Sequence, residues 1–267
     1  MPHIPKLLSI AGSDPSGGAG VQADMKTFSA FGCYGMAAIT ALTAQNTQGV
    51  TASYPVAADI VAAQIEAVLS DIPPDAIKIG MLATPDIAQA VAKALARHGA
   101  SKVVLDPVLV PTQGVSLASA GLEAALVAGL LPLARLVTPN LHEARALTQT
   151  PVAGNAEEMA AQGRLLCEAG ARAALIKGGD LDGEPVDVLF EAGEKRVFPG
   201  RRIPTRNTHG TGCALSSAIA CELAKGAPLI DAIAAAKAWL EGALEAADQL
   251  RLSAGRGPPH HFYALWR

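Results

Sequence analysis

The chain has 267 residues, of which 50% are hydrophobic and 17% charged, with a formal net charge of −3 at pH 7. This is enough apolar material for one large core, and the acidic balance argues against a nucleic-acid surface built on Lys and Arg. Four scattered cysteines without a C-x-x-C pair, no secretory signal and no membrane-length apolar span lead us to expect a cytoplasmic protein without membrane contact.

Short apolar runs alternate with segments of helical periodicity along most of the chain. We expect strands over the runs rich in Val, Ile and Leu: 7–11, 76–82, 102–106, 134–139 and 173–179. Helices are expected between them, over 59–72, 85–99, 122–132 and 157–170. Uninterrupted apolar strands belong to sheets covered on both faces. The pattern therefore predicts an α/β fold, with a doubly wound, mostly parallel sheet flanked by helices.

The last third of the chain has a different pattern. Residues 186–200 predict two short strands around Ala192-Gly193, which form a small antiparallel hairpin at an edge of the sheet. Two helices follow, one beginning at Gly210-Thr211-Gly212 and one over 229–250. Because no linker or repeat divides the sequence, we expect one domain over residues 1–267.

The glycine-rich segment 12–24 follows the first predicted strand, and ligands of open parallel sheets bind outside the carboxyl ends of the strands. It matches neither G-x-G-x-x-G nor a P-loop. Two interpretations are equally open: a flexible turn that caps the next helix, or a backbone-lined wall for a small polar substrate with Asp24 on its inner face.

Two acidic residues follow neighbouring strands. Asp106 ends the strand near 102–105, and Glu143 comes three residues after Asn140. Carboxylates side by side repel unless a cation joins them, and Mg²⁺ held through oxygens and water is the candidate. The Asn140-x-x-Glu143 spacing is also that of a capping box, which alone explains it.

Lys177 and the segment NTHGTGC complete the polar set. Lys177 at a strand end suits a point charge laid on phosphates, although a solvated lysine is the simpler interpretation of this residue alone. A glycine turn that opens a helix, as at Gly210-Thr211-Gly212, directs backbone N–H groups at an anion. The combination on one edge of one sheet favours a phosphate-handling site.

Ordered motifs along the whole chain resemble those of the hydroxymethylpyrimidine/phosphomethylpyrimidine kinases of thiamine biosynthesis, in the ribokinase-like superfamily. They are AGSDPSGGAGVQADMKTFSAFGCYGMAAITALTAQNTQGV, KIGML, VVLDPV, LVTPNLHEA, KGGD, NTHGTGCALSSAIA and GPPHHFYALW. The resemblance implies Mg²⁺-dependent transfer of the ATP γ-phosphoryl group to 4-amino-5-hydroxymethyl-2-methylpyrimidine and then to its monophosphate. A pyridoxal or pyridoxine kinase, which shares the fold, is the alternative.

The resemblance also implies roles for individual residues. The pyrimidine would be held by Gly12, Asp24, Gln45 and Met81. Mg²⁺ would be held by Asp106 and Glu143, and the nucleotide phosphates by Asn140, Lys177, Thr208, Gly210 and Gly212. Where the family has a small-basic-Ser stretch, this chain has Pro111-Thr112-Gln113, so a phosphate contact there would depend on the hydroxyl of Thr112.

Cys213 stands where most ribokinase-like enzymes have an aspartate that accepts the proton of the attacking hydroxyl, so the resemblance implies a catalytic role beside Lys177. A thiol at a helix N-terminus is expected to have a lowered pKa, near neutral pH. The competing interpretation is a small buried residue that fills the turn. Two further classes remain open: a thiol hydrolase that uses Cys213 with His209, and a pyrimidine-binding module without catalysis. Apolar helix faces lead us to expect a homodimer.

Overall fold

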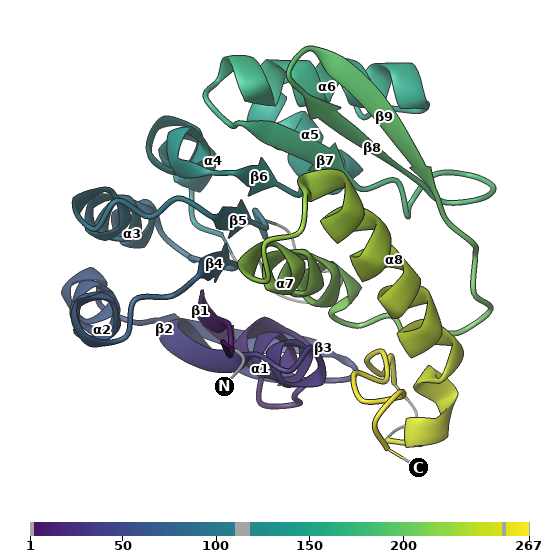
Figure 1. Cartoon of the computed structure of the whole chain (residues 1–267), viewed down its shortest axis with the longest axis horizontal. Helices are drawn as coiled ribbons and strands as arrows, with labels where there is room; N and C mark the ends of the chain where they lie inside the picture. Colours follow the sequence, from purple (N-terminus) through teal and green to yellow (C-terminus); the bar gives the residue numbers. More distant parts are fainter. Residues whose placement is uncertain (1–2, 110–117, 253–254, 267) are drawn as a thin grey trace.

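A computed structural model describes residues 3–109, 118–252 and 255–266, in which nine strands form one sheet (Figure 1). The strands are β1 (Lys6–Ser13), β2 (Tyr34–Asn46), β3 (Gly49–Pro55), β4 (Ala76–Ile79), β5 (Val103–Leu105), β6 (Leu136–Val137), β7 (Ala173–Ile176), β8 (Val186–Glu191) and β9 (Glu194–Pro199). Their order across the sheet is β3-β2-β1-β4-β5-β6-β7-β8-β9. The six strands from β2 to β7 in this order are parallel, and β3, β8 and β9 pair antiparallel at the two edges.

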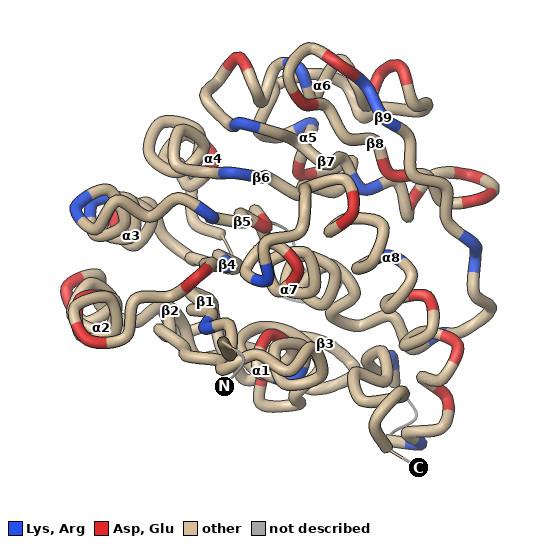
Figure 2. Tube along the Cα trace, viewed as in Figure 1, with Lys and Arg blue, Asp and Glu red and all other residues tan. Residues whose placement is uncertain are grey.

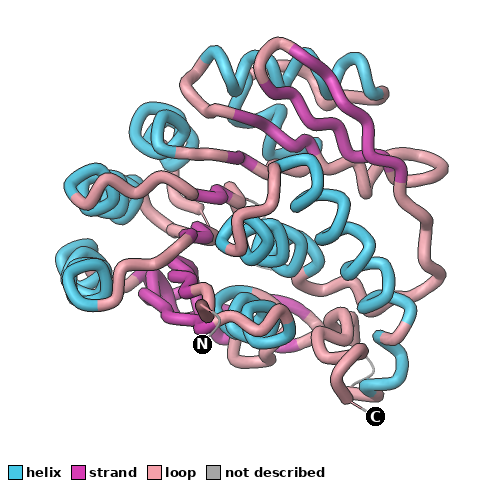
Figure 3. Tube along the Cα trace, viewed as in Figure 1, coloured by secondary structure: helices cyan, strands magenta, loops and turns pink. Residues whose placement is uncertain are grey.

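Helices cover both faces of the sheet (Figure 3). They are α1 (Gly20–Ala30), α2 (Ala58–Asp71), α3 (Pro85–Arg97), α4 (Leu122–Ala125), α5 (Leu141–Thr148), α6 (Ala156–Glu168), α7 (Thr211–Ala224) and α8 (Leu229–Glu245). Helices α2 to α6 pack on one face, and α1, α7 and α8 pack on the other. The helix expected over 122–132 is irregular, because α4 continues as a π-helical turn, Leu126–Leu130, and ends in a 3-10 turn that contains Pro132.

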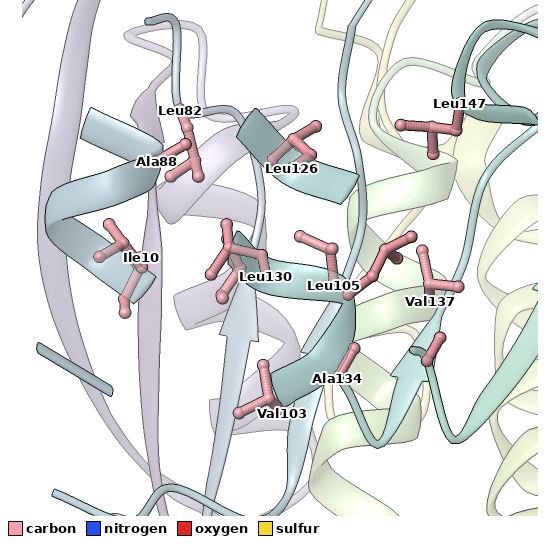
Figure 4. Close-up of a cluster of buried hydrophobic side chains, with 14 of the residues drawn as sticks. Ile10, Leu82, Ala88, Val103, Leu105, Leu126, Leu130, Ala134, Val137 and Leu147 are labelled. Carbon is pink, nitrogen blue, oxygen red and sulfur yellow. The ribbon is translucent and has the colours of Figure 1, made fainter. Parts of the chain in front are cut away.

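Alternate side chains of each central strand enter opposite cores. Leu7 faces the core under α7 and α8, whereas Leu8 and Ile10 face the core under α2 and α3, and all three are fully buried. Figure 4 shows Ile10 and Leu105 of the sheet beside Leu130 of the covering helical layer. Burial on both faces explains why these strands are continuous apolar runs, and the predicted doubly wound sheet is confirmed.

Both edges of the sheet are antiparallel, although only one was predicted. The hairpin expected within 186–200 is confirmed as β8 and β9, with Ala192 (φ 52°) and Gly193 (φ 84°) at its turn. The second edge is the β2–β3 hairpin, in which Leu42 lies opposite Tyr54. Strand β2 was not predicted, because its later residues alternate between exposed and partly buried positions and do not form an apolar run.

Lys and Arg positions are interspersed with Asp and Glu positions along the chain (Figure 2). Among the residues that the structure describes, no helix combines the length and the apolar character needed to cross a membrane.

The strands that follow β1 in sequence lie on both sides of it in the sheet. The chain first returns to the sheet as β2 on one side of β1, and after the β2–β3 hairpin and α2 it returns as β4 on the other side. Such a switch opens a crevice at the carboxyl ends of the strands.

Candidate active site

A cavity of about 540 Å³ lies at this crevice, lined by residues that follow β1, β4, β5, β6 and β7, by the β2–β3 hairpin and by the start of α7. All the predicted site residues except Asp24 line it: Gly12, Gln45, Met81, Asp106, Asn140, Glu143, Lys177, Thr208, Gly210, Gly212 and Cys213. The predicted contact of Thr112, in Pro111-Thr112-Gln113, lies outside the described residues. The structure thus brings groups from both halves of the chain around one space.

Asp24 lies beneath the cavity wall. Its side chain is completely buried, and its carboxylate accepts hydrogen bonds from Lys78 Nζ (2.9 and 3.0 Å), Ser9 Oγ (2.6 Å) and Ser217 Oγ (2.7 Å). The prediction that Asp24 lies on the inner face, in contact with the pyrimidine, is therefore wrong for this structure, because all of its surface is taken by protein.

Lys78 is a cavity-lining cation that the sequence analysis missed. Burial disfavours its charge, but the Asp24 carboxylate offsets this effect and raises the pKa of Lys78 above its usual value. The only hint of this residue in the sequence is a lysine inside the otherwise apolar strand AIKI. Its partner is 54 residues away in sequence, on helix α1, and the two meet only because α1 packs against the sheet.

Asp106 and Lys177 form an ion pair, with Lys177 Nζ 2.7 Å from Asp106 Oδ1. Thr138 Oγ1 and Ser216 Oγ also donate to the Asp106 carboxylate, each at 3.3 Å. Burial opposes ionisation of Asp106, yet Lys177 lowers the pKa of this carboxyl below its usual value. Asp106 and Glu143 in turn raise the pKa of Lys177, against the effect of burial. Both groups are charged at neutral pH.

Asn140 and Glu143 form the capping box of α5. Asn140 Oδ1 accepts from the Glu143 N–H at 2.9 Å, and the Asn140 N–H donates to Glu143 Oε2 at 2.8 Å. The capping interpretation is therefore confirmed, and both side chains also line the cavity. Burial raises the pKa of Glu143 to about 7, while Lys177 acts to lower it. Lys177 thus places a positive charge beside both carboxylates, and the Mg²⁺ expected between them stays a prediction.

The donor set suits a hard cation that brings further ligands with it. Among the described residues, His, Cys, Asp and Glu do not gather in any group of three or more that could hold a metal. Asp106 and Glu143 offer carboxylate oxygens to one cavity, which fits Mg²⁺, since this ion commonly takes one or two carboxylates and completes its shell with water and phosphate.

The first turn of α7 lies next to Lys177 and has no side-chain cap. Gly210, the residue before the helix, has φ 78° and provides no side-chain cap. A Cβ atom there would lie 1.9 Å from the carbonyl oxygen of Gly18, so only glycine fits. A Cβ atom on Gly212 would lie 3.1 Å from Lys177 Nζ, which shows how closely this backbone approaches the lysine. The helix start and the ammonium together form a cradle for an anion.

Cys213 is the third residue of α7, and its half-buried side chain lines the cavity. Burial raises the pKa of its thiol to about 11; Lys78 acts to lower it and Asp106 to raise it further. The prediction of a thiol pKa near neutrality is therefore wrong, because burial and the nearby carboxylates outweigh the helix start and Lys78. The thiol is protonated at pH 7.

Gln45, His209 and Asp14 meet at another part of the cavity lining. His209 Nε2 lies 2.8 Å from Asp14 Oδ2 and 3.2 Å from Gln45 Nε2. This ring nitrogen thus lies against Asp14 and Gln45, and no hydrogen bond to Cys213 is present among the described residues. This geometry argues against a thiol hydrolase built on Cys213 and His209.

A switch-point cavity in which a lysine and a helix start face an acid pair defines a small-molecule kinase of the ribokinase-like class. The sequence profile of one family in this class, phosphomethylpyrimidine kinase, matches residues 14–260. The chain belongs to this family.

Known proteins support the assignment over nearly the full chain. The hydroxymethylpyrimidine/phosphomethylpyrimidine kinase of Rhizobium meliloti is 53% identical, covering 97% of this chain and 98% of its own. The enzyme of the same name from Escherichia coli is 50% identical with the same coverage. Among solved structures, the phosphomethylpyrimidine kinase from Clostridium difficile has a TM-score of 0.78 at 41% identity, covering 89% of this chain and 98% of that one.

Pyridoxal kinases share the fold closely. The pyridoxal kinase from Staphylococcus aureus in complex with AMP-PCP and pyridoxal has a TM-score of 0.90 at 32% identity, covering 99% of this chain and 96% of that one. The chain is thus a kinase of thiamine biosynthesis whose architecture is shared with kinases of another heterocycle.

Proposed function

We propose that the protein transfers the γ-phosphoryl group of ATP to 4-amino-5-hydroxymethyl-2-methylpyrimidine and then to the resulting monophosphate. The observation that carries this proposal is that the Lys177–Asp106 pair, the start of α7 and the amide of Gln45 line one cavity. One set of groups handles phosphate, and the amide recognises a polar heterocycle.

The phosphate-binding part of the cavity supplies most of the rate. Phosphoryl transfer passes through a loose transition state, so catalysis depends on positioning and on stabilising charge over the phosphoryl oxygens. Lys177 and the N–H groups at the start of α7 would bind these oxygens. Asp106 and Glu143 would hold Mg²⁺, which when bound neutralises charge on the phosphates. The capping box keeps Glu143 in place for this role.

Cys213 would accept the proton of the hydroxymethyl oxygen as that oxygen attacks. Its sulfur lines the cavity, and Lys78 is the positive charge that stabilises the thiolate formed. Because the thiol has a pKa of about 11, only a small fraction is thiolate at pH 7. A base is needed for an alcohol acceptor, whereas a phosphate acceptor is already ionised at this pH.

Gly12, Met81 and Gln45 would bind the heterocycle. A Cβ atom on Gly12 would lie 2.3 Å from Met81 Cε, so the glycine lets the methionine side chain lie flat against the backbone. The result is an apolar surface beside an amide, which suits a ring with nitrogen atoms on its edge.

A turnover assay tests the proposal. With ATP and Mg²⁺, we expect product from both the pyrimidine alcohol and its monophosphate, and a kcat/KM for pyridoxal at least about tenfold lower. Preferred turnover of pyridoxal would favour the alternative kinase. Tight binding of the pyrimidine without product would indicate a binding module, and ATP-independent activity that survives EDTA would indicate a thiol hydrolase.

We further propose a cytoplasmic homodimer. The free thiols at all four cysteines are consistent with a reducing compartment. Leu42 and Tyr54 lie opposite each other at the β2–β3 edge and are 53% and 63% exposed, which offers apolar surface for a second copy. Analytical ultracentrifugation at micromolar concentration tests the dimer, and a monomeric mass would reject it.

A further inference from the structure

The hydrogen bonds of Asp14 determine the tautomer of His209. Asp14 is 2% exposed, and its carboxylate accepts from the N–H groups of Ser16, Gly18 and Ala19, from Ser16 Oγ, and from His209 Nε2 at 2.8 Å. Backbone N–H groups can only donate, so they stabilise the ionised carboxylate, which can only accept. His209 Nε2 therefore carries its single proton, which Asp14 Oδ2 accepts at 2.8 Å as the nearer partner and which a second acceptor beside the ring can share.

The imidazole is held in this orientation from other sides as well. A Cβ atom on Gly18 would lie 2.4 Å from His209 Cδ2, so the ring rests directly on the Gly18 backbone. The backbone N–H of His209 donates to the carbonyl oxygen of Gly257 at 2.9 Å. The side chain of His209 thus has a fixed direction, while its backbone is anchored independently of the ring.

A protonated Nε2 determines which way the amide of Gln45 must face. The Gln45 nitrogen and the His209 Nε2 atom are 3.2 Å apart, and two N–H donors at that distance form no hydrogen bond. The oxygen and nitrogen of an amide exchange places by rotation about the last side-chain bond. With the oxygen toward His209, the N–H₂ group faces Thr43 Oγ1, 3.1 Å from the other amide atom. Thr43 Oγ1 donates its own proton to the Ser13 carbonyl oxygen at 2.8 Å, so it is free to accept.

We propose that His209, held by Asp14, is a positioning residue that fixes the Gln45 amide with its oxygen toward the imidazole and an N–H toward the substrate. This inference rests on the proposed function. One amide hydrogen is used by Thr43, and the other points into the cavity as a donor. The enzyme then recognises the pyrimidine through an unprotonated ring nitrogen, and it discriminates against the ring-protonated cation.

Substitutions of His209 separate positioning from folding. His209→Leu removes the donor and releases the amide, so we expect KM for the pyrimidine to rise about tenfold, as for one lost hydrogen bond. KM for ATP and kcat should change less than about threefold, because the His209 backbone keeps its bond to Gly257. His209→Gln places a side-chain N–H near the same point and should restore most of the affinity for the pyrimidine. Equal losses toward both substrates, without rescue by glutamine, would overturn the proposal.

The pH dependence of KM for the pyrimidine is a further test, because it would not change if His209 had only a structural role. The charged or titratable groups around this network are Asp14 and Lys26 of the first loop and helix, His209 itself, and Arg256 of the C-terminal segment. His209→Gln has no imidazole at this point, and KM for ATP over the same pH range reports Glu143, whose pKa is about 7. A rise in KM for the pyrimidine alone, as pH falls through the ring pKa, then belongs to the substrate.

Gln45→Glu reverses the expected preference. A carboxylate there offers only acceptors, so KM for the pyrimidine should fall, not rise, as the ring becomes protonated. A wild-type KM that is flat or falls through the ring pKa would overturn the inference. Failure of the wild type to phosphorylate the pyrimidine at any pH would instead reject the proposed function.

Discussion

At the level of single residues, Cys213 is placed between opposing charges. Lys78 favours its thiolate, and Asp106 and Asp24 disfavour it, with burial as the largest effect, so its pKa of about 11 lies above the usual value. A base of this kind is strong when formed and rarely formed at neutral pH. Its contribution should therefore depend on the acceptor and on pH.

Cys213→Ala should slow phosphorylation of the alcohol far more than phosphorylation of the monophosphate. We expect a loss of about 10²- to 10³-fold in the first reaction and less than about tenfold in the second, because only the alcohol must lose a proton. In the wild type the first reaction should also become faster as pH rises toward the thiol pKa, and the variant should lose this rise. Rapid-quench assays of both reactions between pH 6 and 9 measure the difference.

Cys167→Ala is the matched control, because this cysteine lies outside the cavity lining, with its sulfur 3.6 Å from the carbonyl oxygen of Phe190. It should leave both reactions unchanged. Equal losses in the two reactions of Cys213→Ala would assign Cys213 to packing.

At the level of elements, helix α5 begins at the cavity with a capping box. Its acidic residue, Glu143, is also the proposed Mg²⁺ ligand. A glutamine at the position of Glu143 can make the same bond to the Asn140 N–H, since capping boxes accept Glu or Gln. The helix start and the proposed metal ligand can therefore be separated by one substitution.

Glu143→Gln should keep the stability of the protein and weaken its use of Mg²⁺. We expect the unfolding midpoint to move by less than about 2 °C and the Mg²⁺ concentration for half-maximal rate to rise about tenfold, because one carboxylate ligand is lost. Asn155→Ala is the control: Asn155 caps α6 by accepting from the N–H groups of Glu157 and Glu158. It should cost about 1 kcal/mol of stability and leave the Mg²⁺ dependence unchanged. An unaltered Mg²⁺ requirement in Glu143→Gln would remove this residue from the metal site.

The sequence predicts the elements that are buried on both faces and the polar residues that follow them. Asp106 and Lys177 could be placed at one edge of the sheet because β5 and β7, on either side of β6, are continuous apolar runs. The β2–β3 hairpin could not be predicted, since the later half of β2 is partly exposed and lacks such a run. Contacts between a helix and the sheet could not be predicted either: the Lys78–Asp24 pair joins β4 to α1, and no local pattern encodes it.

At the level of the whole molecule, the C-terminal segment returns to the active site (Figure 1). The Arg256 N–H donates to the Thr47 carbonyl oxygen, and the Gly257 N–H donates to Asn207 Oδ1, both at 2.9 Å. The same segment accepts from the N–H of His209. The chain end thus joins the β2–β3 turn to the loop before α7, so its attachment affects how the substrate and phosphate groups face each other.

This attachment should weaken in acid because of His261, which is 4% exposed and packs near Trp239 at a ring-centroid distance of 6.3 Å. Burial, together with Lys26 and His260, lowers the pKa of His261 to about 4, from 6.5. Between these values the unfolded chain binds the proton and the folded chain does not, so stability is lost as pH falls from 6.5 toward 4. The two pKa values give a loss of about 2 kcal/mol at pH 5 relative to pH 8.

His261→Phe keeps a ring beside Trp239 and removes the titration. Thermal unfolding of wild type and variant at pH 8 and pH 5 measures the effect. The difference in midpoint between the two pH values should be smaller in the variant by about 4–8 °C, the shift that about 2 kcal/mol produces in a chain of this length. His142→Phe, at an exposed position at the start of α5, removes a histidine that is not enclosed in this way and should keep the wild-type difference. If His261→Phe also kept it, the acid sensitivity would lie elsewhere, and the C-terminal segment would not be the pH-dependent part of the site.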